Sequence, residues 1–332
     1  MSEEKTSEQK IEELELLLNQ QEDEMVRLRD ERSSTVRKLR KAKLKLVVPS
    51  EAVQKLAKTA GPLDDVFFMK LAEDIATIEE IISTVLNVPV KVKSTIPQFT
   101  ITNTGSRGVR LDSFAEIIVE VELQKDCFWG EKGTFVDVEV QKENVGDHEF
   151  RVFYNGASMV INKTPKNTDF ADIARAIVIY ISAFDVFKEG KVFYETVKVD
   201  KESKNPRRSP VSELYVNTEN LEAAANDQDE RIRRVSALMK VFRDPDWYDE
   251  QMFPAFSKRK KELHETEKGV EDVSREMQLI IDEEVKKAEQ KAEEREVASI
   301  RSLKEKLKLT TQEAMDAMSI PTDRQARYAQ MV

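Results

Sequence analysis

Apolar and polar residues alternate along residues 134–142, which read Thr-Phe-Val-Asp-Val-Glu-Val-Gln-Lys. Successive side chains of a β-strand point to opposite faces of the sheet. The pattern therefore predicts a strand with the valines on one face and Asp137, Glu139 and Gln141 on the other.

A second strand-like run covers residues 110–123 and carries Asp112 among apolar residues. The glycine-containing segment 125–133 between the two runs is typical of a hairpin connection. A hairpin would bring Asp112 close to the face that carries Glu139. Two converging carboxylates suit Mg²⁺, which prefers oxygen ligands and usually binds one or two carboxylates together with water and phosphate.

Hydrophobic periodicity predicts an α/β domain around this pair. Residues 177–181 read Ile-Val-Ile-Tyr-Ile, which is typical of a strand covered on both faces. Strand, helix and strand in succession imply a crossover unit and a three-layer core. Helices are predicted over 62–86 (as one helix or two), 146–162 and from 228 onward, and strands over 98–103, 176–182, 192–199 and 213–216.

The pattern over 146–162 predicts an amphipathic helix. Its apolar face is formed by Phe150, Phe153, Tyr154, Ala157, Val160 and Ile161.

Both ends of the chain are helical by pattern. Residues 8–46 carry apolar positions at alternating steps of three and four, which predicts a coiled-coil seam that pairs with another copy or with the other long helix. Residues 258–308 read as one long, charged helix. In the tail, Thr310 and Glu313 predict a capping box, and Pro321 begins a last helix.

Composition narrows the class of protein. The 332 residues are 40% hydrophobic, with no apolar run long enough for a membrane span, and the N-terminus has no secretory pattern. A single cysteine and two histidines exclude a disulfide within the chain and a cysteine- or histidine-rich metal site. We therefore expect a cytoplasmic protein without a membrane partner.

The net charge of −10 argues against nucleic-acid binding, because nucleic-acid-binding proteins are more often basic. Two basic runs qualify this average: one between Arg37 and Lys45, and Lys258-Arg259-Lys260-Lys261. They are either solvated helix faces or clusters that contact phosphates.

The chain resembles the bacterial PD-(D/E)XK nuclease family transposases, which are related to the recombination-promoting nucleases. The resemblance covers about residues 64–256 and part of the tail. Its blocks are Asp64-Asp65-Val66-Phe67-Phe68, Val109-Arg110-Leu111-Asp112, Val138-Glu139-Val140-Gln141-Lys142-Glu143, His148 with Arg151 and Tyr154-Asn155, Val178 to Asp185, and Glu313-Ala314-Met315.

This resemblance implies a restriction-endonuclease-like core, a mixed sheet flanked by helices, that hydrolyses DNA with Mg²⁺, or with Mn²⁺ as a substitute. Asp112 and Glu139 match the two acidic positions and would be both catalytic residues and metal ligands. Gln141 falls where nucleases of this superfamily usually have lysine. Glutamine can only hydrogen-bond, so it would position water rather than stabilise negative charge.

Four further residues are candidates for a role in the site, and each also has an alternative interpretation. Arg151 would bind phosphate, or else form a structural ion pair with Glu139 or Asp112. Tyr154 would assist on the same helix face, or lie in the core. His148 is expected at the surface, with a general-acid role as the alternative. Asp65 is an accessory acid, or a carboxylate that stabilises a helix N-terminus.

Three functional classes follow: a metal-dependent DNA endonuclease, a weakly active or inactive DNA-binding relic of that fold, and a coiled-coil interaction scaffold. The sequence shows no independent DNA-recognition motif. We also expect a homodimer through the N-terminal helix. The predicted domains are an N-terminal coiled coil (1–48), a nuclease-like domain (60–256), a long charged helix (257–309) and a small helical tail (310–332).

Overall fold

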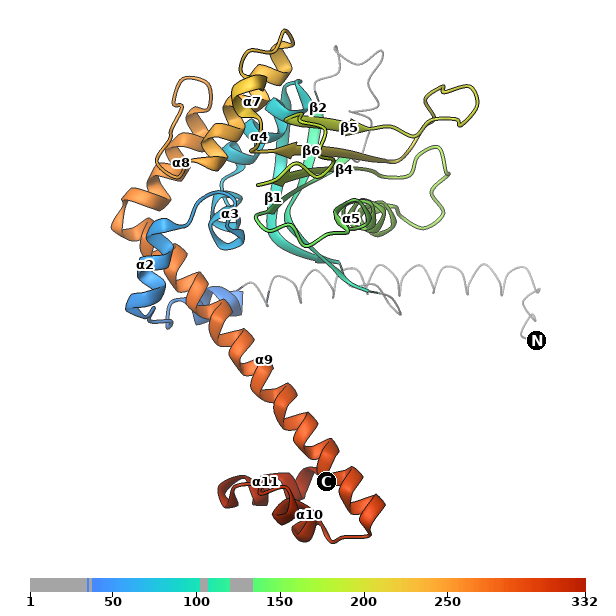
Figure 1. Cartoon of the computed structure of the whole chain (residues 1–332). Helices are drawn as coiled ribbons and strands as arrows, with labels where there is room; N and C mark the ends of the chain where they lie inside the picture. Colours follow the sequence, from blue (N-terminus) through green and yellow to red (C-terminus); the bar gives the residue numbers. More distant parts are fainter. Residues whose placement is uncertain (1–34, 36–37, 102–106, 120–133) are drawn as a thin grey trace, which may run out of the picture. The chain divides into compact units, whose positions relative to one another are not determined.

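The computed structural model describes residues 35, 38–101, 107–119 and 134–332 (Figure 1). The chain divides into two compact units. The larger is Pro49–Met277, and the smaller combines Gln278–Val332 with the described part of Met1–Val48. Most of the predicted N-terminal coiled coil, and the predicted hairpin connection over 125–133, lie outside the described residues.

The larger unit is built on a mixed six-stranded sheet with the strand order β1-β2-β3-β4-β6-β5. β1 pairs antiparallel with β2, and β2 pairs antiparallel with β3. β3, β4 and β6 run parallel to one another, and β5 pairs antiparallel with β6. The strands are β1 Val90–Ile101, β2 Val109–Val119, β3 Thr134–Gln141, β4 Arg175–Ser182, β5 Phe193–Thr196 and β6 Val211–Asn217.

One face of the sheet carries the main core. Val136, Val138 and Val140 of β3 point into it, as the alternating pattern predicts. Helices lie over this face of the sheet (Figure 1), and their buried apolar residues belong to the same core. They include α3 Asp65–Leu71, α4 Ile75–Leu86, α7 Glu230–Arg243 and α8 Pro254–Glu265. α2 Glu51–Thr59 and the short α6 Leu221–Ala224 also contribute buried residues to this core.

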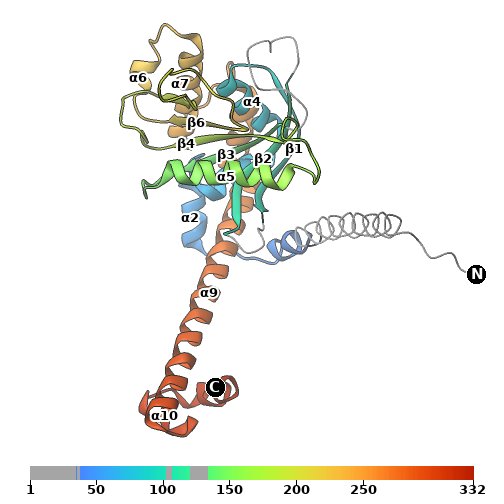
Figure 2. The same cartoon turned by 90° about the vertical axis from the view of Figure 1, so that its right-hand side faces the viewer.

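The opposite face of the sheet carries a single long helix, α5 His148–Lys163, which crosses the strands in Figure 2. α5 connects β3 to the parallel strand β4, so the predicted crossover unit is confirmed. Beneath α5, the rings of Phe99, Phe114 and Phe135 stack in a row. The sheet is therefore covered on both faces, and it forms the middle of three layers.

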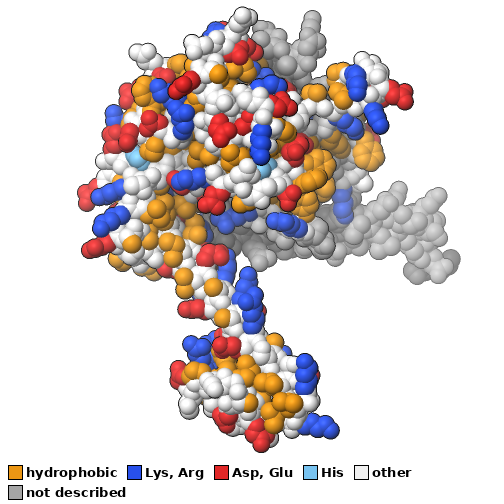
Figure 3. Space-filling model, viewed as in Figure 1, with side chains coloured by type: hydrophobic (Ala, Val, Ile, Leu, Met, Phe, Trp, Pro, Cys, Tyr) orange, Lys and Arg blue, Asp and Glu red, His pale blue; other side chains and the backbone are white. Residues whose placement is uncertain are grey.

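Most of the predicted apolar face of α5 does not pack on the sheet, although Val160 is partly buried against the core beneath the helix. Phe150 is 76% exposed and Ile161 74% exposed, and Phe153 and Tyr154 also lie at the surface. Figure 3 shows that hydrophobic side chains occur among the charged ones on the surface of the molecule. The opposite side of the helix packs on the sheet. Its buried residues include small and polar ones, and these fit closely against the strands: His148, Val152, Asn155, Gly156, Ser158 and Met159.

Gly156 explains part of this inversion. A β-carbon at this position would collide with the side chain of Val211 in β6, so glycine lets the helix backbone approach the strand. Glycine contributes little to a hydrophobic pattern, so a prediction based on hydrophobicity alone does not identify this side of the helix as the buried one.

Other predicted elements are confirmed with shifted ends. The apolar segment 62–86 forms two helices, α3 and α4. β1 begins at Val90, earlier than the predicted strand over 98–103. It is an edge strand, and edge strands tolerate lysines and a proline such as Pro97, which do not indicate a strand in the sequence. β5 is shorter than the predicted 192–199.

The long helix predicted over 258–308 is instead two helices, α8 and α9 Glu267–Leu307. The chain turns at Thr266, whose backbone is extended and whose hydroxyl donates to the Glu262 carbonyl and accepts from the Gly269 N–H. A β-carbon on Gly269 would strike the Glu262 carbonyl, so this sharp corner requires glycine.

The basic run 258–261 is not a uniformly solvated face. Lys260 is fully buried, and its ammonium donates to the carbonyls of Val241, Asp244 and Trp247. It satisfies acceptors that the end of α7 leaves open. Burial lowers the pKa of Lys260 to about 8.

The smaller unit holds the rest of α9, followed by α10 Thr311–Ala317 and α11 Thr322–Met331. The predicted capping box of Thr310 and Glu313 is confirmed. Residues 38–44 are helical, and Lys43 pairs with Glu283 of α9 at 2.9 Å. Among the residues that the structure describes, no helix is both long and apolar enough to cross a membrane.

Candidate functional site

The candidate site lies where the ladder between β2 and β3 stops. The two strands pair from Ile117–Thr134 to Phe114–Asp137. Continuing that register would place Asp112 opposite Glu139. At this point side chains replace the backbone ladder: the Asp112 N–H donates to Glu139 Oε1 at 3.0 Å, and the Val140 N–H donates to Asp112 Oδ2 at 3.2 Å.

Asp112 also faces an irregular position on its other neighbour, β1. Pro97 pairs with Ser113 and Phe99 with Leu111, and Gln98 between them has a left-handed φ of 55°. The pairs on either side of Gln98 keep the same register, so the irregularity in β1 is confined to the position opposite Asp112. The expectation that Asp112 meets the face carrying Glu139 is confirmed.

Arg151 brings positive charge to this pair. It lies in the first turn of α5 and donates to Glu139 Oε2 at 2.9 Å and to Gln141 Oε1 at 2.8 Å. Glu139 is completely buried, whereas the Arg151 side chain is 44% exposed. Of the two expected roles for Arg151, the ion pair with Glu139 is present, and the exposed side of the guanidinium still faces solvent.

Burial dominates the electrostatics of these carboxyls. It raises the pKa of Asp112 well above its usual value, with the charges of Glu139 and Asp65 acting in the same direction. It also raises the pKa of Glu139, which the Arg151 charge partly offsets. Buried acids this close cannot all be ionised without a compensating cation.

Asp137 shares the face of Glu139 and is also fully buried. Asn155 of α5 donates to its Oδ2 at 3.5 Å, while Oδ1 has no hydrogen-bond partner when the carboxyl is taken as ionised. Burial and the neighbouring Glu139 raise the pKa of Asp137 well above its usual value. A protonated Asp137 that donates to Glu139 would satisfy both observations.

The expectation that His148 lies at the surface is wrong. His148 is buried at the start of α5, with Nδ1 2.7 Å from Tyr180 Oη and Nε2 2.8 Å from Asn144 Oδ1. Burial, together with the nearby Arg151 charge, lowers the pKa of His148, which favours a neutral ring. It links β4 to the loop before α5, so His148 lies close to the acids without touching them.

Tyr154 and Asp65 lie at the edge of the site. Tyr154 is exposed rather than in the core, and its hydroxyl donates to the Arg107 carbonyl at 2.6 Å. Asp65 is the first residue of α3, and its charge is one cause of the raised pKa of Asp112. Next to it, Asp64 pairs with Lys142, which follows β3, at 2.7 Å.

The carboxylate oxygens of Asp112 and Glu139 are suitable ligands for a hard cation, but most of them accept hydrogen bonds in this structure. Carboxylate oxygens are the ligands that Mg²⁺ prefers. Both Glu139 oxygens and one of Asp112 accept hydrogen bonds, one of them from Arg151. In the part of the chain described by the structure, no cluster of three or more metal-ligating side chains is present. A cation could be held by Asp112 and Glu139 once Arg151 leaves Glu139.

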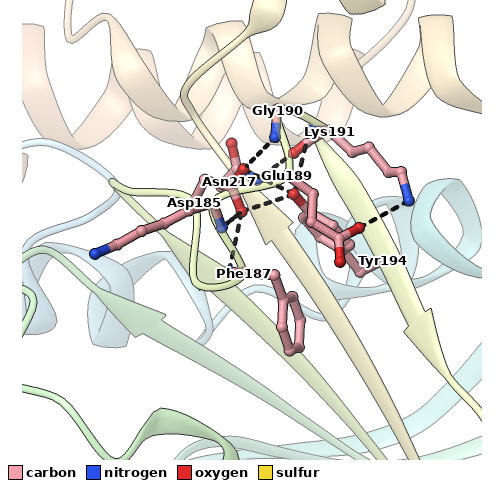
Figure 4. Close-up of polar contacts among 8 residues, drawn as sticks. Asp185, Phe187, Glu189, Gly190, Lys191, Tyr194 and Asn217 are labelled. Atoms are coloured by element: carbon pink, nitrogen blue, oxygen red, sulfur yellow. Dashed lines mark hydrogen bonds and ion pairs between the residues drawn. The ribbon is translucent and has the colours of Figure 1, made fainter.

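A second polar cluster follows β4 and has a structural role. Asp185 accepts from the N–H groups of Phe187, Lys188 and Gly190 and from the Tyr194 hydroxyl (Figure 4). Burial acts against it, but the bond from Tyr194 and these backbone donors lower the pKa of Asp185. Both carboxylate oxygens of Asp185 therefore accept hydrogen bonds that hold the loop after β4 in place.

Sequence reasoning missed two residues of the site. Tyr180 lies within an apolar strand, yet the parallel register of β3 and β4 pairs it with Glu139. Asn155 faces Asp137 from α5. A polar atom in the middle of a run such as residues 177–181 was the available signal, because a buried hydroxyl needs a partner.

Comparisons with protein-family models, curated proteins and solved structures found no match to this chain.

Proposed function

We propose that the protein is a metal-dependent DNA endonuclease that hydrolyses phosphodiester bonds. The observation that carries the proposal is the break in the β2–β3 ladder, where Asp112 and Glu139 replace backbone pairing with carboxylate contacts. Structural strands are more stable with a continuous ladder. Buried acids at a break, next to an exposed arginine, are typical of a site adapted for function.

Asp112 and Glu139 would hold Mg²⁺ or Mn²⁺. The bound ion would polarise the phosphate and lower the pKa of a bound water. Arg151 would turn its guanidinium from Glu139 to a phosphate oxygen, an exchange of one anionic partner for another that its exposed side allows. Gln141, at the end of β3, would hydrogen-bond the attacking water. DNA would be the partner.

The architecture agrees with the resemblance to the PD-(D/E)XK nucleases. A mixed sheet lies between helices, and α5 returns from β3 to β4 with Arg151 directed at the acids. The restriction-endonuclease-like fold and the relation to recombination-promoting nucleases are part of this proposal.

A plasmid-nicking assay tests the proposal. Supercoiled plasmid is incubated with Mg²⁺ or Mn²⁺ and the wild type, Asp112→Ala, Glu139→Ala or the control Glu143→Ala, which removes an exposed carboxylate just beyond β3. We expect both site variants to lose at least a hundredfold in rate, because each removes a metal ligand, and the control to keep full activity. Nicking that survives both site substitutions would contradict the proposal.

Measuring DNA binding alongside cleavage separates two alternative functions. A DNA-binding relic would bind DNA with a steep salt dependence without cleaving it. A coiled-coil scaffold would do neither.

For the homodimer we propose through residues 1–46, removing those residues should halve the mass measured by light scattering, and an unchanged mass would exclude that interface.

A further inference from the structure

The C-terminal end of the chain forms a three-helix module with a core of its own. The last turns of α9 supply Val297, Ile300 and Leu303, and α10 supplies Ala314 and Met315. Ile320 and Tyr328 close this core from the turn and from α11. The module is therefore held together independently of the sheet.

The turn between α10 and α11 has a specific shape. α10 is a short helix of seven residues that ends at Ala317, with Met318 as its C-cap. Ser319 then adopts a left-handed φ of 54°, and the buried Ile320 donates its N–H to the Met315 carbonyl at 3.0 Å. Pro321 precedes the first turn of α11. Two helices joined by such a tight turn, packed on a third, form a helix-turn-helix arrangement.

The second helix, α11, directs one side into the module and the other to solvent. Tyr328 is buried, and Gln325 bonds to Gln312 and Asp316 of α10. The outer side has no large apolar residue. It carries Thr322, Asp323, Ala326, Arg327 and Gln330, which are all exposed.

This outer side has the chemistry that reads base edges. Glutamine pairs with adenine, arginine with guanine, and aspartate accepts from the cytosine amino group. Arg327, 70% exposed, is paired with Glu293 of α9, which places its guanidinium at the border of the outer side. Asp323 is an acidic member of this surface, so recognition here would depend on the pattern of hydrogen bonds more than on charge.

Two exposed lysines lie beside the first helix of the pair. Lys306 and Lys308 are at the corner between α9 and α10, and in helix-turn-helix proteins the first helix crosses the DNA backbone. Figure 3 shows basic and acidic side chains interspersed on the module. Local lysines are sufficient for phosphate contacts, because the salt-dependent part of binding arises from the few charges near the backbone.

We propose that α10 and α11 form a helix-turn-helix that places α11 in the major groove of duplex DNA. This site is separate from the carboxylates of Asp112 and Glu139, and it would supply the DNA recognition that the sequence does not show. It goes beyond the proposed nuclease and does not need hydrolysis.

The test measures DNA binding by the full chain carrying Asp112→Ala, in EDTA, with a fluorescein-labelled mixed-sequence duplex read by anisotropy. Two variants form a matched pair: Ala326→Glu on the outer side of α11, and Ala317→Glu at an exposed position of α10. We expect Ala326→Glu to weaken binding by about tenfold or more, since a carboxylate in the groove meets phosphates on both sides, and Ala317→Glu to leave it within about twofold.

A second readout tests the phosphate contact. Lys308→Ala should weaken binding and lower the slope of log K against log salt by about 0.9, the effect of one lost phosphate contact. Circular dichroism checks that each variant keeps its helices, and Gln330→Glu replaces Ala326→Glu if the latter fails to fold. Equal effects from Ala326→Glu and Ala317→Glu, or no DNA binding by the full chain, would overturn the proposal.

Failure here is distinguishable from failure of the nuclease proposal. Cleavage depends on divalent cations and on Glu139, whereas this binding is measured in EDTA with the site already disabled. DNA binding without cleavage would contradict the nuclease proposal and still support the helix-turn-helix. If Ala326→Glu changed neither binding nor cleavage, the helix-turn-helix proposal would be contradicted.

Discussion

At the scale of single residues, the site is a cluster of buried charge with one compensating partner. Glu139 is fully buried and accepts from the Asp112 N–H and from Arg151. Burying a carboxylate is costly unless it is paired and hydrogen-bonded. Arg151 therefore stabilises the fold in the state described by the structure, and the same residue is the one proposed to bind phosphate.

Replacing Arg151 with alanine should destabilise the protein by about 1–3 kcal/mol, because it leaves a buried carboxylate without its charged partner. The exposed side of the arginine keeps this below the cost for a fully buried pair. Urea unfolding measures the loss. Adding Glu139→Gln to Arg151→Ala should recover part of it, since a neutral amide needs no counter-charge. Losses that simply add would show that the two residues do not interact.

Lys260 gives a pH-dependent prediction away from the site. Burial lowers the pKa of Lys260 to about 8 in the folded state, against about 10.4 in an unfolded chain. Between these values the unfolded state binds more protons, so stability rises with pH. The unfolding free energy of the wild type minus that of Lys260→Met should therefore increase from pH 8 to 10.5. A difference that stays flat over that range would refute the shift.

At the scale of elements, α5 has two faces with different purposes. Its buried face is small and partly polar, which lets Asn155 reach Asp137 and lets the helix backbone lie close to β6 at Gly156. Its outer face carries large apolar side chains, including Phe150 and Ile161. Packing against the strands, rather than hydrophobicity, decides which face turns inward.

Two substitutions two residues apart on α5 test this orientation. Met159 is fully buried and Ile161 is 74% exposed. Met159→Ala should cost about 2–5 kcal/mol through lost burial and a cavity, whereas Ile161→Ala should change stability by no more than about 0.5 kcal/mol. Chemical denaturation compares them. The opposite order would mean that the apolar stripe faces the core.

At the scale of the whole molecule, α9 runs from one compact unit into the other. Its residues 284–292 are all exposed, so this stretch has no buried side chain to anchor it. Segments with few buried apolar contacts open locally at low free energy. The two units therefore need not unfold together.

Brief trypsin treatment should cut α9 after Lys286, Lys287, Lys291 or Arg295 before it cuts within α8, where Lys260 is buried. Mass spectrometry would then find a C-terminal fragment that begins between residues 287 and 296. Early cleavage after Lys260, with α9 intact, would contradict this view of where the chain opens.

The strands that carry the acids could be predicted from their residue pattern. The alternation of valines with Asp137, Glu139 and Gln141 follows from the two-residue period of a strand, and it predicted which of these residues share a face. The meeting with Asp112 was predicted from a hairpin between neighbouring strands. The capping box of α10 was equally readable, because its partners are three residues apart. These features depend on local geometry, which a periodic pattern records.

Features that depend on packing between distant segments could not be predicted from the residue pattern. The orientation of α5, the burial of His148 against Tyr180, the break at Thr266 and the ammonium of Lys260 at the end of α7 all arise from contacts between segments far apart in the chain. Hydrophobic periodicity assigns a stripe to a helix but does not measure the space opposite it. Where a glycine or a buried polar partner fits that space better, close packing overrides the pattern.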